Sequence, residues 1–144
     1  MNPEGSAMKA LTISQPYASL ISSGEKFVEN RTWETKYRGP LAIHAGKGTQ
    51  YMTAAEMVAE GLPTGQIIAT GDLQACVELE WSRKIYEERI GWDLVDLPSW
   101  LTLPELLMHE YTEGPWCWII TNVQKIEPVV IAGKLGLWNW EGAA

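Results

Sequence analysis

Short segments that alternate apolar and polar residues, separated by turn residues, are the feature that most constrains the fold of this chain. Residues 27–33 and 41–45 both alternate with the period of two that is typical of a β-strand. The residues between them include Tyr37-Arg38-Gly39-Pro40, a composition that favours a turn. Short connections of this kind favour antiparallel pairing over an array of parallel crossover units.

The same reading extends along the rest of the chain. Further strands are predicted at residues 9–13, 66–80, 115–123, 126–131 and 136–140, and helices near 14–23, 50–60, 82–90 and 103–111. Strands occur in both halves with helices inserted between them. We therefore predict an α+β protein built on a small mixed, mostly antiparallel β-barrel with peripheral helices. Its 144 residues suit a single domain over residues 8–144, and the small and polar residues 1–7 are predicted to be a tail.

Aromatic residues and cysteines indicate how this barrel is filled. The chain has eight tryptophans and one phenylalanine. The pairs at 116 and 118 and at 138 and 140 are two residues apart, so each pair shares one strand face, as core residues do. Cys76 and Cys117 lie in apolar segments and are predicted to be buried free thiols.

Charge is distributed unevenly along the chain. The net charge of −7 argues against indiscriminate binding of polyanions. Residues 54–113 hold three cations against twelve carboxylates, a net charge of −9, whereas residues 24–53 hold five cations against three carboxylates, a net charge of +2. A locally cationic segment in an acidic protein predicts a selective anion site.

That cationic segment contains Gly24-Glu25-Lys26-Phe27-Val28-Glu29-Asn30-Arg31, which has the form G-x-K-x-x-E-x-R. The glycine is predicted to end the preceding helix, which Ser14 is expected to cap. Lys26 then lies at the entrance to a strand on which Glu29 and Arg31 share a face. The planar fork of an arginine suits phosphate, and a glutamate between cations can orient them. An ordinary surface ion-pair cluster is the alternative interpretation.

Four further side chains extend the candidate site. Trp33 and Tyr37 flank the cations and are candidates for stacking on a base, and Arg38 adds a second arginine. His44 is interpreted either as a hydrogen-bonded structural residue or as a ligand contact. Two isolated histidines do not make a metal site, so neither a metal nor a cofactor is predicted. No apolar run approaches the ~20 residues that span a bilayer, and no signal peptide is evident, which favours a cytoplasmic protein with no membrane partner.

Several segments of the chain match a known family in order. These are residues 11–18, the G-x-K-x-x-E-x-R motif, residues 37–45, residues 65–77 and the tryptophan-rich end. With them the chain resembles the ASCH domain, the activating signal cointegrator homology domain of the PUA-like superfamily. The resemblance implies a PUA-like barrel with a cationic cleft beside the first helix, and it implies binding of RNA or nucleotides. The ligand-binding residues would be Lys26, Glu29, Arg31, Trp33, Tyr37, Arg38 and His44.

Two other functions stay open. The superfamily includes metal-independent amidohydrolases that deacetylate acetylcytidine with a lysine, a threonine and a glutamate, and some related proteins have been linked to RNA cleavage. Lys26 matches that lysine, but the threonine position three residues later holds Glu29 here, so an enzyme acting on a modified nucleoside or RNA would use Lys26 and Glu29. The third reading is a protein-interaction module that uses the acidic residues 54–113.

Overall fold

The computed structural model describes residues 8–142, which group into two compact units. The first unit holds residues 8–26, 40–72 and 122–142, and the second holds residues 27–39 and 73–121. The predicted tail, residues 1–7, lies outside the described residues. The prediction of one domain over residues 8–144 stays a prediction.

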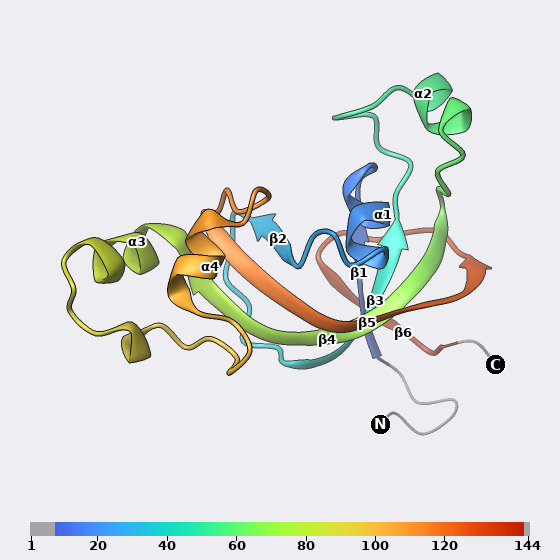
Figure 1. The fold of residues 1–144 in the computed structure, drawn as a ribbon. Helices are drawn as coiled ribbons and strands as arrows, with labels where there is room; N and C mark the ends of the chain where they lie inside the picture. Colours follow the sequence, from blue (N-terminus) through green and yellow to red (C-terminus); the bar gives the residue numbers. More distant parts are fainter. Residues whose placement is uncertain (1–7, 143–144) are drawn as a thin grey trace. The chain divides into compact units, whose positions relative to one another are not determined.

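Six strands form a mixed sheet in the order β2-β5-β4-β3-β1-β6 (Figure 1). Their bounds are β1 (Met8–Ile13), β2 (Val28–Arg31), β3 (Gly39–Ala45), β4 (Gln66–Glu78), β5 (Trp116–Val130) and β6 (Leu137–Trp140). Within the described residues no hydrogen-bonded ladder closes this order into a ring. The α+β class, the mixed sheet and the peripheral helices are thus confirmed, and closure into a barrel stays a prediction.

Four short α-helices and one 3-10 helix lie between the strands in the described part of the chain. They are α1 (Tyr17–Ser22), α2 (Ala54–Ala59), α3 (Leu79–Glu87), η1 (Trp92–Leu94) and α4 (Leu103–Met108). None of the helices in residues 8–142 has the length and apolarity needed to cross a membrane.

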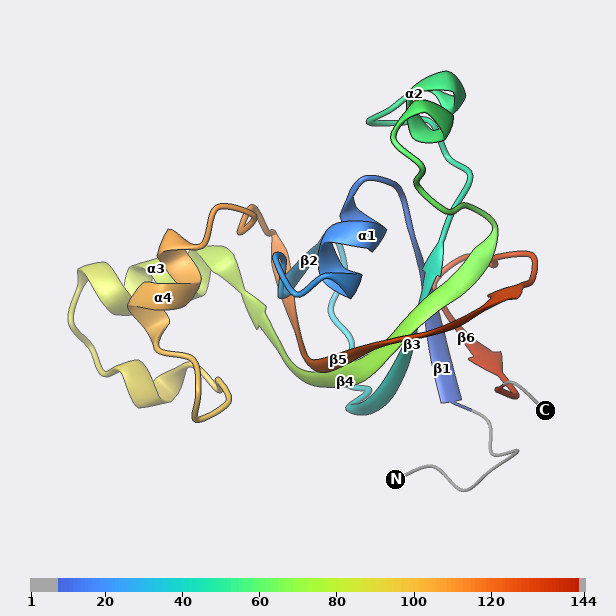
Figure 2. The same cartoon turned by 45° about the vertical axis from the view of Figure 1, so that its right-hand side comes forward.

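In the first unit, β1 lies between β3, which is parallel to it, and β6, which is antiparallel (Figure 2). The register pairs Ala10 with Ala42 on one side and with Trp138 on the other. These residues pack with Ile67 and Trp140 in a buried cluster. The prediction that the two C-terminal indoles are core residues is therefore confirmed.

The pairing partly contradicts the expectation drawn from the turn at residues 37–40. The strands that this turn joins are separated in the sheet by β5 and β4. β2 instead pairs antiparallel with β5, and β3 pairs parallel with β1. A short connection limits which strands can pair, but burial of apolar faces by distant segments decides which ones do.

The start of α1 also differs from its prediction. Pro16 occupies the cap position, and Ser14 makes no side-chain cap. Instead the fully buried Gln15 accepts a hydrogen bond from the Ser19 backbone N–H at 3.0 Å and donates to the Pro63 carbonyl at 2.8 Å. The other end follows the prediction: Gly24 has a φ of +85°, and its N–H donates to the Ile21 carbonyl at 3.0 Å.

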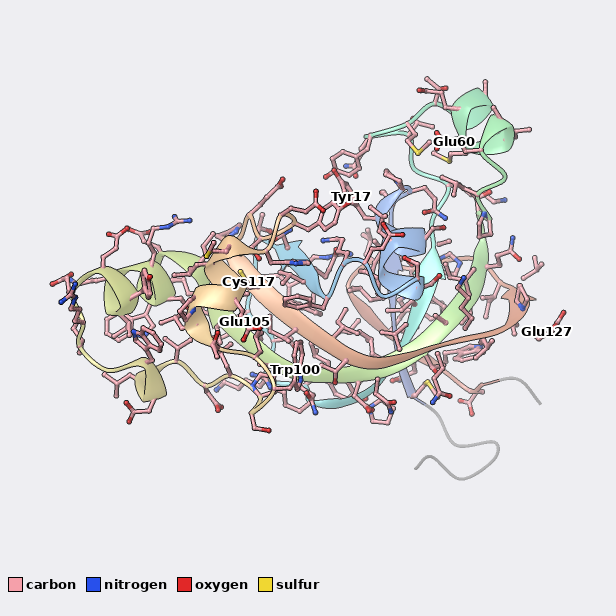
Figure 3. All side chains as sticks on the ribbon, viewed as in Figure 1. Tyr17, Glu60, Trp100, Glu105, Cys117 and Glu127 are labelled. Atoms are coloured by element: carbon pink, nitrogen blue, oxygen red, sulfur yellow. The ribbon has the colours of Figure 1, made fainter. Side chains whose placement is uncertain are left out.

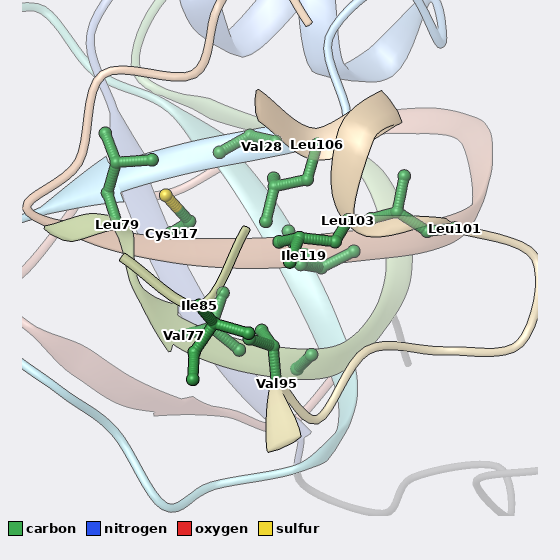
Figure 4. Packing of buried hydrophobic residues seen from close by; sticks show 11 residues of the cluster. Val28, Val77, Leu79, Ile85, Val95, Leu101, Leu103, Leu106, Cys117 and Ile119 are labelled. Atoms are coloured by element: carbon green, nitrogen blue, oxygen red, sulfur yellow. The ribbon is translucent and has the colours of Figure 1, made fainter. Parts of the chain in front are cut away.

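In the second unit, an apolar cluster joins β2, α3, α4 and the parts of β4 and β5 that belong to this unit (Figure 4). Val28, Val77, Ile85, Leu106 and Ile119 are buried members of the cluster. Cys76 and Cys117, one on each long strand, are buried free thiols, as predicted.

The long strand β5 replaces two predicted strands, residues 115–123 and 126–131. Near the predicted break, Asn122 has a φ of +52°, a conformation that asparagine tolerates better than most residues. Its amide donates to the Asp72 carboxylate at 3.2 Å. Residues 116–130 are therefore one continuous strand, and the residue with a positive φ lies within it.

Candidate functional site

Lys26 of the motif lies in the first unit, four residues after the end of α1. Its backbone N–H donates to the Leu20 carbonyl at 3.1 Å, so the end of the helix fixes its position. The residue is only 2% exposed, and its Nζ lies 5.3 Å from the ring centroid of Tyr17. Figure 3 labels Tyr17, which is the first residue of α1. Tyr17 in turn meets Tyr51 edge-on at 4.8 Å. A buried ammonium held over an aromatic face is a strong departure from the exposure that is usual for lysine.

Glu29 and Arg31 lie on β2 in the second unit and form an ion pair, as the period-two pattern predicts. The Oε2 atom of Glu29 accepts hydrogen bonds from Nε of Arg31 at 2.9 Å and from Nη2 at 2.8 Å. Pairing with β5 sets the two residues opposite Trp118 and Trp116. Glu29 is 7% exposed and the Arg31 side chain 22% exposed. The carboxylate therefore holds the guanidinium in a defined orientation.

Asn30, between these two residues, has a structural role that the sequence analysis missed. Its Nδ2 donates to the Tyr111 carbonyl at 2.8 Å, and its Oδ1 accepts from the N–H groups of Glu113 at 2.9 Å and Gly114 at 2.8 Å. The only sequence signal was a polar side chain on the strand face shared with Val28. Asn30 thereby ties the motif strand to the turn that precedes β5.

Trp33 presents a partly exposed indole just after β2. It is 37% exposed and packs edge-to-face against Trp118, with 4.7 Å between the ring centroids. The Trp118 Nε1–H donates to the Trp33 carbonyl at 3.2 Å, which fixes the backbone beneath the exposed ring. An aromatic surface supported from below suits stacking on a planar group.

Arg38 closes the turn that follows. Its Nη1 donates to the carbonyls of Thr35 and Tyr37, both at 2.9 Å, and the residue is exposed. Burial raises the pKa of the nearby Cys76 thiol, an effect that the Thr35 backbone hydrogen bond and the positive charge of Arg38 partly offset. The thiol therefore stays protonated at neutral pH and is not an activated nucleophile.

His44 has a different set of neighbours within the first unit. It lies on β3 opposite Thr12 of β1, its Nε2 lies 2.7 Å from the Ile131 carbonyl, and its ring meets that of Trp138 edge-on at 5.7 Å. A carbonyl only accepts hydrogen bonds, so Nε2 carries the hydrogen. The pocket that His44 lines contains none of the motif residues.

The predicted residues thus fall into three groups. Glu29, Arg31, Trp33, Tyr37 and Arg38 lie close in sequence in the second unit, with the contacts given above, whereas Lys26 and His44 belong to the first unit and contact different residues. Among residues 8–142, no group of three or more histidine, cysteine, aspartate or glutamate side chains is arranged to hold a metal ion.

The chain is similar to solved crystal structures of an ASCH protein. The crystal structure of ASCH from Zymomonas mobilis is similar with a TM-score of 0.47 and 20% identity, over 88% of this chain and 74% of that one. Two mutants of that protein give TM-scores of 0.46 and 0.45 at 18% identity, over 84% and 88% of this chain and 73% and 74% of theirs. These TM-scores are low, so the assignment of this chain to a family rests only on the match to a family model.

No curated protein matches the chain. The family model of the ASCH domain matches residues 11–130, which is most of the chain. The protein therefore belongs to the ASCH domain family.

Proposed function

We propose that this protein binds RNA or nucleotides through its G-x-K-x-x-E-x-R motif. Family membership supports this function, because ASCH domains are generally RNA-binding. The observation that carries the proposal is the ion pair between Glu29 and Arg31, which orients a partly exposed guanidinium on β2. An arginine fixed in this way is preorganised to receive a phosphate group, so little side-chain entropy is lost on binding.

The neighbouring residues take complementary roles. Arg31 and Arg38, both in the second unit, contact phosphate oxygens. Trp33 or Tyr37 stacks on a base. Besides orienting Arg31, the carboxylate of Glu29 is suited to accept a hydrogen bond from an exocyclic amine. The PUA-like barrel and the cytoplasmic location belong to the same proposal.

Fluorescence anisotropy with a labelled, short single-stranded RNA at low salt tests this function. Replacing Arg31 by alanine removes a charge-assisted contact and is expected to weaken binding roughly tenfold or more. The matched control is Arg83→Ala, which removes an exposed arginine of the same unit from α3. RNA that fails to bind at low salt, or an equal loss in the two variants, would overturn the proposal.

Hydrolysis of a modified nucleoside or of RNA is a second candidate. The burial of two ionisable side chains, Lys26 and Glu29, favours it, because such groups concentrate at functional sites. Chromatography after incubation with acetylcytidine, or with RNA, would detect turnover. Activity that is present in the wild type and lost in both Lys26→Ala and Glu29→Gln supports catalysis. An unchanged substrate between pH 6 and 9 rejects it.

A protein-interaction surface is a third candidate, and exposed aromatic residues of the second unit favour it. Tyr86 and Trp92 are exposed, and their ring centroids lie 5.7 Å apart. They lie within the acidic residues 54–113. Capture of a binding partner that is lost in Tyr86→Ser with Trp92→Ser, and kept in Arg31→Ala, would favour this surface over the motif. The opposite pattern would exclude it.

A further inference from the structure

The first unit contains a pocket of about 530 Å³ that the motif does not use. It is lined by side chains of β1 and β3 and by the segment from Val130 to Leu135. The volume lies within the range of sites that take small molecules. Thr12, His44, Lys47, Ile131, Gly133 and Lys134 are the lining residues that matter to the argument below.

A buried polar atom without a partner belongs to one of these lining residues. His44 is 2% exposed, and its Nε2–H is committed to the Ile131 carbonyl at 2.7 Å. The second ring nitrogen, Nδ1, is buried and has no hydrogen-bond partner among the described residues. In the neutral ring this atom is an acceptor. Buried polar atoms nearly always have a partner, so this unpaired acceptor on a pocket-lining residue calls for a donor that the described residues do not supply.

Gly133 allows the segment from Val130 to Leu135 to approach this histidine closely. A Cβ atom on Gly133 would lie 2.6 Å from Thr12 Oγ1, 2.8 Å from His44 Cε1 and 3.0 Å from His44 Nδ1. Any larger residue would push the segment away from β1 and β3. The close approach of this segment to the Thr12 hydroxyl and the His44 ring therefore requires glycine at position 133.

The charge of the pocket has one sign. Lys47 and Lys134 line it, and no aspartate or glutamate does. The Nζ atom of Lys134 lies 5.9 Å from the ring centroid of Trp138, and within the described residues neither lysine forms an ion pair or a hydrogen bond. Two ammonium groups at one pocket, without a carboxylate, match a ligand group that carries nearly two negative charges, as a phosphate monoester does at neutral pH.

We infer that this pocket binds a small phosphate monoester that also carries hydroxyl or N–H groups. The two lysines bind the phosphate, and a hydroxyl or N–H of the ligand donates a hydrogen bond to Nδ1 of His44. The side chains of Val130, Ile131 and Leu135 give the ligand an apolar wall. None of these residues takes part in the RNA-binding proposal. His44, which the sequence predicted as a ligand contact beside the motif, belongs to this separate pocket.

Isothermal titration of the 144-residue chain with ribose 5-phosphate tests the inference, with inorganic phosphate and ribose as partial ligands. Ribose 5-phosphate is expected to bind saturably and more tightly than either partial ligand. Lys47→Ala and Lys134→Ala are each expected to weaken binding about tenfold, the loss typical of one charge-assisted contact. Lys125→Ala, which removes an exposed lysine of the same unit outside the pocket, is expected to change nothing.

A nitrogen-15 NMR spectrum of the histidine rings gives a second readout that does not depend on the lysines. Saturation with ribose 5-phosphate is expected to shift the Nδ1 resonance of His44, because that atom gains a hydrogen bond. Gly133→Ala, checked for folding by circular dichroism, is expected to abolish this shift. The absence of saturable binding, an equal loss in Lys125→Ala, or binding without a shift of His44 would overturn the inference.

Discussion

At the scale of single residues, Asn30 shows how a candidate binding motif is held by a side chain on the other strand face from Glu29 and Arg31. Glu29 and Arg31 pair with each other on β2, while Asn30 bonds to three backbone groups of the turn at residues 111–114. The side-chain amide of Asn30 supplies both the donor and the acceptor that these groups need. The asparagine within the motif therefore contributes to stability rather than to ligand binding.

Replacing Asn30 by alanine is expected to lower the free energy of unfolding by roughly 2–4 kcal/mol, since three backbone groups lose their partner. Urea denaturation followed by circular dichroism measures the loss. Asn139→Ala is the matched control, because that exposed amide only accepts a hydrogen bond from Lys9, at 2.8 Å. Equal losses in the two variants would show that the turn does not depend on Asn30.

At the scale of secondary-structure elements, the short helices depend on their caps. A helix of six residues, such as α4, is too short to be stable alone in water. Thr102 and Glu105 form a capping box at its start, with bonds of 3.0 and 3.2 Å, and Leu103 and Leu106 bury one face. Capping and burial together therefore hold the helix.

This capping box predicts a stability difference that depends on pH. The side-chain and backbone hydrogen bonds from Thr102 lower the pKa of Glu105 from its ordinary value of 4.5. A lowered pKa stabilises the fold at pH values above 4.5, and the contribution is lost as the pH falls through the folded-state pKa. Glu105→Gln is therefore expected to be less stable than the wild type, and this stability difference is expected to be larger at pH 7 than near pH 3. Urea denaturation at the two pH values measures it.

The same comparison in a Thr102→Ala background provides the control, because the alanine removes the side-chain hydrogen bond. In the Thr102→Ala background, the stability difference between Glu105 and Glu105→Gln should depend less on pH. In a Thr102→Ser background, that difference should keep its pH dependence. A difference that is the same at both pH values in the wild-type background would contradict the role of the capping box.

The sequence predicts the local features of helices and strands, but it does not predict how distant strands pair. Local rules predicted a helix near residues 103–111, the glycine end of α1 and the strand face shared by Glu29 and Arg31, because each depends on neighbouring residues. Strand pairing depends on distant segments, so the parallel partnership of β1 and β3 was not predicted. The roles of Gln15, Asn30 and Gly133 could not be predicted for the same reason, since each contacts a segment far along the chain.

At the scale of the whole molecule, charge limits how this protein can bind a nucleic acid. The chain carries a net charge of −7, and its carboxylates concentrate in residues 54–113, away in sequence from the cationic residues 24–53. An acidic protein is repelled by a long polyanion, so binding must depend on a few cations at one place. The proposed RNA contacts use two of them, Arg31 and Arg38.

This number sets the expected salt dependence of RNA binding. For single strands the logarithm of the binding constant falls with the logarithm of salt concentration by about 0.7 per phosphate neutralised, so two contacts give a slope of about −1.4. Arg38→Ala should reduce the slope to about −0.7, while Trp33→Ala should weaken binding at every salt concentration without changing the slope, because stacking releases no counterions. A slope much steeper than about −1.4, or one that Arg38→Ala leaves unchanged, would mean that cations other than Arg31 and Arg38 bind the RNA.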